Sequence, residues 1–167
     1  YGTADFITSH NACAHIDNLL DVMKGVEHWL SEDGIFVLEV GYLVDVYENT
    51  WFDTIYHEHL DFHTLGPFEN LFKRANMELI GVQRIKPQGG SIRVMAQKKY
   101  GNFDRDSSLD VLIKLEQNLK LDKVETFYKF QEKINIVRAK LQKLLRSLKE
   151  SGKIIAGFGA PTKATTL

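Results

Sequence analysis

Apolar and polar residues follow one another along the first part of the chain in the patterns of strands and helices. Residues 4–9 are short, aromatic and β-branched, and residues 35–40 form a nearly continuous apolar run, so both are predicted to be strands. Between them, over residues 17–30, apolar side chains recur at helical spacing behind good capping residues, and residues 31–34 are predicted to turn the chain. Strand, helix and strand with short connections form a βαβ unit, so the two strands should be parallel.

The pattern continues with two short helices and a second pair of strands. Helices are predicted over residues 44–49 and 67–76, and the second of them begins at a proline. Residues 78–85 and 91–96 read as strands on either side of a turn at 87–90, so they should pair antiparallel. A parallel pair extended by an antiparallel hairpin predicts a mixed α/β sheet.

A polar, glycine-containing stretch over residues 98–106 predicts a subdomain boundary. Beyond it, residues 124–150 are predicted to form one long helix, because apolar residues step by three and four along it: Phe127, Phe130, Ile134, Val137, Leu141, Leu144 and Leu148. Two interpretations of this seam stay open, a helix packed on its own domain and a helix-to-helix contact in a dimer. Residues 153–156 are predicted to be a buried strand that leads through a glycine-rich turn into another helix.

Composition and charge indicate a soluble globular protein without a nucleic-acid partner. The 167 residues are 44% hydrophobic and 26% charged, and a net charge of −1 provides no basic field for a phosphate backbone. The single Cys13 excludes a disulfide framework and a cysteine-based zinc site inside the chain, which suits a reducing cytoplasm. No apolar run approaches the ~20 residues of a membrane span. Because both ends look cut, we expect a piece of a longer cytoplasmic enzyme.

The residues that carry the most chemistry are Tyr56, His57, Glu58 and His59. On a helical turn Tyr56 and His59 would share a face, whereas on an extended segment Tyr56 and Glu58 would share one. An imidazole can remove a proton from carbon beside a carbonyl, a carboxylate can orient the imidazole, and a phenol can donate to the developing oxyanion. The alternative is a metal-binding or structural pair of histidines, but a third ligand is missing, so no metal is predicted.

Two further positions are weaker candidates for a binding site. His15 lies just beyond the first predicted strand, at the sheet edge where ligands bind in open α/β sheets; it would otherwise be a solvated side chain or an N-terminal cap partner. Gly157 and Gly159 follow the last predicted strand and would present backbone N–H groups to a phosphate, with Lys163 adding a positive charge. A tight turn without a ligand explains the same glycines.

Five segments, taken in order, resemble one family of enzymes. They read NACAHI (11–16), GIFVLEV (34–40), FDTIYHEHL (52–60), QGGSIRV (88–94) and GFGAPTK (157–163). This set is similar to the S-adenosylmethionine-dependent C-methyltransferases that act on nucleotide-linked keto-deoxysugars, and the resemblance covers nearly the whole chain. It implies a parent protein with an N-terminal zinc-binding region, a central methyltransferase domain and a C-terminal Rossmann-like domain that helps to hold the nucleotide-sugar.

The resemblance also implies how the chain is divided. Residues 1–99 would be a partial methyltransferase domain, the C-terminal half of a Rossmann-like sheet with two parallel strands plus an antiparallel hairpin. Residues 100–167 would be a partial nucleotide-sugar-binding domain, with the long helix at about 124–150 and the first strand of a second Rossmann-like domain. The zinc region and the loop that grips S-adenosylmethionine would precede residue 1, so the cofactor site and the zinc are expected outside this chain.

Roles for individual residues follow from the same resemblance. His59 would be the base that removes the proton beside the keto group to give an enolate, with Tyr56 and Glu58 as its partners. The substrate side would comprise His15, Gly89, Gly90, Gly157, Gly159 and Lys163. We expect no nucleic-acid or membrane partner, and a homodimer through the strand edge at 4–9 or the helix at 124–150. The alternatives are a methyltransferase of the same fold acting on another small molecule, and a non-catalytic oligomerising α/β module.

Overall fold

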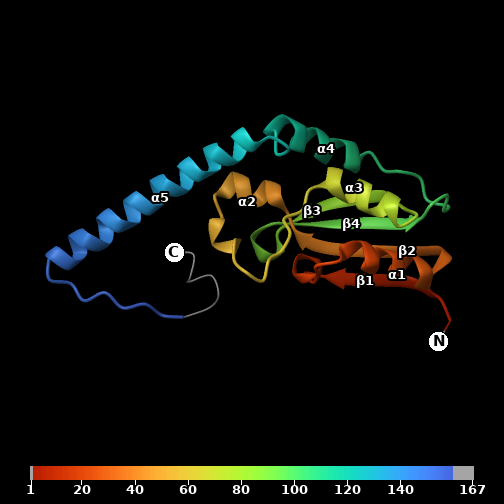
Figure 1. Cartoon of the computed structure of the whole chain (residues 1–167), viewed down its shortest axis with the longest axis horizontal. Coiled ribbons are helices and arrows are strands. Elements are labelled where there is room, and N and C mark those ends of the chain that lie inside the picture. Colours follow the sequence, from red (N-terminus) through yellow and green to blue (C-terminus); the bar gives the residue numbers. More distant parts are fainter. Residues whose placement is uncertain (1, 160–167) are drawn as a thin grey trace.

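The computed structural model describes residues 2–159, which form an α/β body from which one long helix projects (Figure 1). The strands are β1 (Ala4–His10), β2 (Leu30–Gly41), β3 (Met77–Ile85) and β4 (Ser91–Lys98). The α-helices are α1 (Leu19–Trp29), α2 (Leu43–Asn49), α3 (Leu65–Arg74), α4 (Ser108–Leu119) and α5 (Val124–Glu150). The elements predicted from the periodicity up to residue 150 are therefore confirmed, with shifted boundaries.

The four strands form a mixed sheet in the order β1-β2-β4-β3, which confirms the predicted α/β class. β1 runs parallel to β2, and β4 pairs antiparallel with both β2 and β3. In this register His10 lies beside Glu39, and Gly41 lies beside Ser91. The carboxyl ends of β1 and β2 and the turn before β4 consequently meet at one edge of the sheet.

Residues 31–34 correct one prediction, because they do not turn the chain as a separate loop. β2 begins at Leu30, directly after α1, and Leu30 pairs with Ala4. From the Ala4–Leu30 pair to the Phe6–Ile35 pair, β1 advances by two residues and β2 by five, so residues 31–34 are an irregularity within the strand. Leu30 is fully buried, and this burial fixes the start of the strand.

The hydrophobic core lies between the sheet and helices α1, α3 and α4. One face of β2 contributes Phe36, Leu38 and Val40 to it, each at most 1% exposed, and Phe36 meets the ring of Phe72 from α3 with centroids 6.2 Å apart. The opposite face of the sheet is more open, since Phe6 on β1 is 63% exposed. β1 is an edge strand, and the loops that follow β1 and β2 lie at the carboxyl end of the parallel pair.

A buried carboxylate joins helix α4 to the start of α3. Glu116 Oε1 accepts hydrogen bonds from Tyr42 Oη at 2.9 Å and from the backbone N–H of Leu65 at 2.8 Å. Glu116 Oε2 accepts a longer bond, 3.5 Å, from the N–H of Gly66. The side chain thus caps the first turn of α3, which begins two residues before Pro67, where the sequence had placed its start.

Helix α5 leaves the body after its third turn. Phe130 packs on Tyr47 of α2 with ring centroids 5.8 Å apart, and Lys133 Nζ lies 4.5 Å from the centroid of the same ring. Further along, the apolar seam is open to solvent, with Leu144 56% exposed. The interpretation that the whole seam packs on its own domain is therefore wrong for the described residues, since only the first turns make this contact.

The predicted strand at 153–156 is also wrong. Residues 153–159 form no helix or strand and are exposed, and within the described part of the chain no strand pairs with them. Ile154 and Phe158 are almost completely exposed, so the apolar run lacks the partner strand that would bury it. Gly157 and Gly159 lie in this exposed stretch, and Lys163 lies outside the described residues. Among the helices described, none is long and apolar enough to span a bilayer.

Candidate active site

Three loops meet at the carboxyl end of the parallel strands and line a cavity of about 240 Å³. They are the loop after β1, the loop between α2 and α3, and the turn before β4. The cavity contains His15, Tyr56, His59 and Gly90 from the residues singled out in the sequence. A larger hollow of about 530 Å³ lies elsewhere and is lined largely by charged residues such as Glu69, which pairs with Arg105, and it contains no histidine.

The imidazole of His59 is held by two hydrogen bonds that fix its tautomer. Nδ1 lies 2.8 Å from the carbonyl oxygen of Thr54, which can only accept, so Nδ1 carries a proton. In the neutral ring Nε2 then has a free lone pair, and it accepts the Tyr56 hydroxyl at 3.0 Å. The N–H of His59 bonds the carbonyl of Tyr56 at 3.0 Å, so this segment is a turn and the two side chains share a face. The helical-turn alternative is the one that the fold adopts.

His15 joins the same cluster from the loop after β1. Its Nδ1 donates to the backbone carbonyl of Glu58 at 2.7 Å, and its ring centroid lies 5.1 Å from that of His59. The N–H of Leu60 also donates to the carbonyl of Ala14 at 2.8 Å, so the backbones of the two loops are bound together. With Nδ1 as the donor, the Nε2 of a neutral His15 is an acceptor.

The carboxylate of Glu58 lies elsewhere. It is 4.0 Å from Nε2 of His57, both side chains are exposed, and neither residue is among those that line the cavity. Glu58 therefore contributes to the cluster through its backbone carbonyl, which accepts a hydrogen bond from His15, and its carboxylate is not one of the hydrogen-bond partners of the His59 ring.

Gly89 and Gly90 make room for neighbouring protein side chains. Gly89 has φ +88°, and a Cβ there would lie 2.9 Å from a ring carbon of Trp51. Gly90 has φ +152°, and a Cβ there would overlap the carboxylate of Asp45. That carboxylate binds Arg84, with an Nη2–Oδ1 distance of 2.8 Å. The two glycines thus set the position of a cavity wall, and Gly90 also lines the cavity directly.

Sequence reasoning missed several residues of the cavity wall, among them Trp51, Asp61, Phe62 and His63. His63 is 7% exposed and stacks on Phe68 with centroids 4.7 Å apart, and its Nε2 has no hydrogen-bond partner among the described residues. Burial lowers the pKa of His63 to about 4, partly opposed by the charge of Asp61, so its imidazole is neutral near pH 7. No local pattern signals this, because the burial comes from α3.

The described residues contain no group of three His, Cys, Asp or Glu side chains that could hold a metal ion. Gly157 and Gly159 do not line the cavity. What the cavity assembles is one imidazole with an oriented lone pair, a phenol bonded to it and a second imidazole beside it. This set can move a proton to and from a small ligand without a metal ligand set of its own.

Comparison with known proteins relates both halves of the chain to methyltransferases. Residues 1–82 match a family model described as a methyltransferase domain, and residues 86–167 match one described as a C-methyltransferase C-terminal domain. The C-methyltransferase NovU of Streptomyces niveus is 32% identical over 167 residues, which are 100% of this chain and 40% of NovU.

Among solved structures, a chain of the complex that contains the Haloferax volcanii Trm112 methyltransferase activator is similar, with a TM-score of 0.50 and 12% identity. The match covers 60% of this chain and 56% of that chain, and at this identity it shows the fold alone.

Proposed function

Both halves of the chain match methyltransferase family models, and from this premise we propose that the full-length protein is an S-adenosylmethionine-dependent C-methyltransferase. Its acceptor would be the carbon beside the ketone of a nucleotide-linked deoxysugar. The observation that carries this proposal is the oriented lone pair of His59 Nε2 in a cavity at the carboxyl end of the parallel strands. Carbon methylation of this kind requires a base for the acceptor C–H bond, and His59 has the geometry of one.

In the proposed reaction His59 acts as the base while it is neutral. Nε2 takes the proton from the carbon beside the ketone, and the electrons of that C–H bond move into the carbonyl group to give an enolate. Nδ1 keeps its proton throughout, because the carbonyl of Thr54 holds it. The ring therefore presents a single nitrogen to the substrate, and its charge as a cation is stabilised by the Thr54 carbonyl.

Tyr56 is placed to stabilise the enolate oxygen. In the free protein its hydroxyl donates to His59 Nε2, and this bond is lost when Nε2 takes the substrate proton. The hydroxyl is then able to donate to the ketone oxygen as negative charge develops there. His15 Nε2 would accept a hydrogen bond from a hydroxyl of the bound sugar, since its Nδ1 is occupied by the Glu58 carbonyl. S-adenosylmethionine would supply the methyl group.

The chain spans 40% of the length of NovU, so we assign the whole reaction to the full-length protein. We propose that residues 1–99 are the C-terminal half of the methyltransferase sheet, with further strands beside β1, and that residues 100–167 begin the nucleotide-sugar-binding domain. The exposed edge of β1 and the uncovered run at 153–159 support this arrangement. On this proposal, the 167-residue chain alone transfers no methyl group. Detection of methyl transfer by the isolated chain would contradict it.

The test of the base uses His59→Ala in the full-length protein, with His57→Ala as the matched control. His57 is two residues away, exposed and outside the cavity, so its loss should leave turnover unchanged. Loss of the general base should lower kcat by about 10²–10⁴-fold. A second readout isolates the proton step: in D₂O without the methyl donor, wild type should exchange the acceptor C–H and His59→Ala should not. Near-normal turnover and exchange in His59→Ala would refute the assignment.

A further inference from the structure

The charged residues of the cavity wall indicate the charge of the ligand, which the proposed reaction by itself does not specify. Among the residues that line the cavity, Asp61 is the only carboxylate, and there is no lysine or arginine. The guanidinium behind the Gly90 wall is Arg84, and Asp45 and Glu48 both bind it, with Nη2–oxygen distances of 2.8 and 2.6 Å. No free positive side chain therefore faces the cavity within the described residues.

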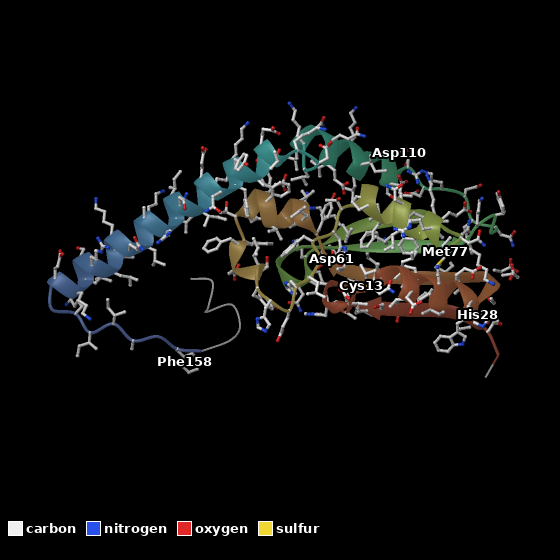
Figure 2. All side chains as sticks on the ribbon, viewed as in Figure 1. Cys13, His28, Asp61, Met77, Asp110 and Phe158 are labelled. Carbon is white, nitrogen blue, oxygen red and sulfur yellow. The ribbon has the colours of Figure 1, made fainter. Side chains whose placement is uncertain are left out.

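Asp61 itself has no hydrogen-bond or ion-pair partner among the described residues, and its charge acts on the His63 imidazole. That imidazole is neutral near pH 7, so it does not compensate the carboxylate. Asp61 is exposed and lies in the loop between α2 and α3, where Figure 2 labels it. Its negative charge is left for water or for a ligand.

The remaining wall also favours a positive charge. Trp51, Tyr56 and Phe62 all line the cavity, and the face of an aromatic ring attracts a cation. Aromatic walls with one carboxylate are the surroundings in which proteins bind ammonium-type groups. A diphosphate, in contrast, is typically bound by arginine or lysine, and neither is among the residues that line this cavity.

We propose that this cavity binds a positively charged group of a ligand, with Asp61 as its counter-charge and the rings of Trp51, Tyr56 and Phe62 around it. The inference rests on the proposed function in one respect, the two candidate sources of the cation: an ammonium substituent on the sugar ring and the sulfonium of the methyl donor.

The size of the cavity fits only the reacting part of such a ligand. About 240 Å³ is below the ~300–1,000 Å³ of pockets that enclose whole drug-sized ligands, so the reacting ring fits and a complete nucleotide-sugar does not. The diphosphate and the nucleoside would then lie outside the cavity, on surface away from Asp61.

Calorimetric binding to the full-length protein tests the inference, with Asp61→Asn compared against Glu132→Gln. The control removes the same charge from an exposed position on α5 that lies outside the cavity. The ligands form two pairs that differ by one positive charge: S-adenosylmethionine with S-adenosylhomocysteine, and an amino-substituted keto-sugar nucleotide with its hydroxyl counterpart. Asp61→Asn should weaken the charged member of one pair by about 3–10-fold and leave its neutral partner unchanged. The affected pair identifies the source of the cation.

Equal effects on charged and neutral members, or no selective effect in either pair, would overturn the inference. A protein that binds none of these four ligands would refute the proposed function and leave the charge preference to be measured separately. In that case tetramethylammonium and tert-butanol are titrated while the NMR signals of Trp51 and His15 are followed. Shifts with tetramethylammonium alone, reduced in Asp61→Asn, support the inference, and equal or absent shifts refute it.

Discussion

The carboxylate of Glu116 is expected to contribute strongly to stability, because it joins α4 to the start of α3. Replacement of Glu116 by alanine would remove the acceptor for the Tyr42 hydroxyl at 2.9 Å and for the Leu65 N–H at 2.8 Å. Both donors belong to residues that are fully buried, so water cannot replace the lost acceptor without a rearrangement. A buried polar group left without a partner costs about 1–3 kcal/mol.

Two such donors give an expected loss of about 2–6 kcal/mol in the free energy of unfolding for Glu116→Ala. Glu116→Gln keeps one acceptor oxygen and should lose less. Gln117→Ala is the matched control, because Gln117 is the next residue on the same helix and is exposed; its change should stay within about 0.5 kcal/mol. Urea unfolding followed by circular dichroism measures all three variants on the same chain.

The pH dependence gives an independent check. Burial raises the pKa of Glu116 above its ordinary value of 4.5, against the lowering effect of its hydrogen bonds. In the folded state the carboxyl therefore keeps its proton to a higher pH than in the unfolded state, so its contribution is largest below about pH 4.5 and is lost as the pH rises through the raised value. Relative to Glu116→Gln, wild type should lose stability as pH increases across this window.

Two results would refute this reasoning. One is an Ala variant that unfolds at the same urea concentration as wild type. The other is a difference between wild type and Glu116→Gln that does not change with pH, since the Gln variant cannot titrate at this position.

Three other substitutions test the wall, the buried imidazole and the projecting helix. Gly90→Ala should destabilise the protein by about 3 kcal/mol, because its Cβ would displace Asp45 and its φ is +152°. The control is Gly25→Ala on α1, where the space around the glycine is open, and it should stabilise the protein by about 0.5–1 kcal/mol. Equal urea midpoints for the two variants would contradict the reasoning. His63→Phe should unfold with unchanged or greater stability near pH 7. Wild type should become less stable as the pH falls from 6.5 to 4, because the lowered pKa of His63 means that its imidazole must be protonated in the folded state at a cost. Over this window the free energy of unfolding of His63→Phe should therefore fall by up to about 3 kcal/mol less than that of wild type. Equal acid sensitivity of the two proteins would count against this reasoning. Leu144→Asp should leave the urea midpoint unchanged, because that side chain is 56% exposed. The same change should reduce any self-association seen by sedimentation. A decrease of more than about 1 kcal/mol in the free energy of unfolding would show that Leu144 contacts the body.

The elements of the fold were largely predictable because their signal is local. The 3.6-residue period of α5 predicted its bounds, and the apolar run of β2 predicted a covered strand. The prediction was wrong at residues 31–34 and 153–156, where the outcome depends on which strand lies alongside. Leu30 has a partner in β1, whereas the run from Lys153 has none among the described residues.

The candidate site was predictable in its residue types and only partly in its arrangement. The spacing of Tyr56 and His59 allowed two geometries, and the turn that the backbone adopts decided for the one that joins them. Glu58 could not be placed from the sequence, because the direction of its carboxylate depends on that same turn.

By itself, the sequence determined the periodicity of the helices and strands, the mixed sheet and the presence of a cluster of tyrosine, histidine and glutamate residues, since each of these follows from neighbours along the chain. The tertiary structure decided the tautomer of His59, the burial of His63 and the uncompensated charge of Asp61. These properties depend on how the backbone folds: Phe68 covers His63 from the next helix, and the loop after β1 brings His15 to Glu58. Hydrogen bonding and desolvation depend on which atoms meet in space, and one-dimensional patterning does not encode that.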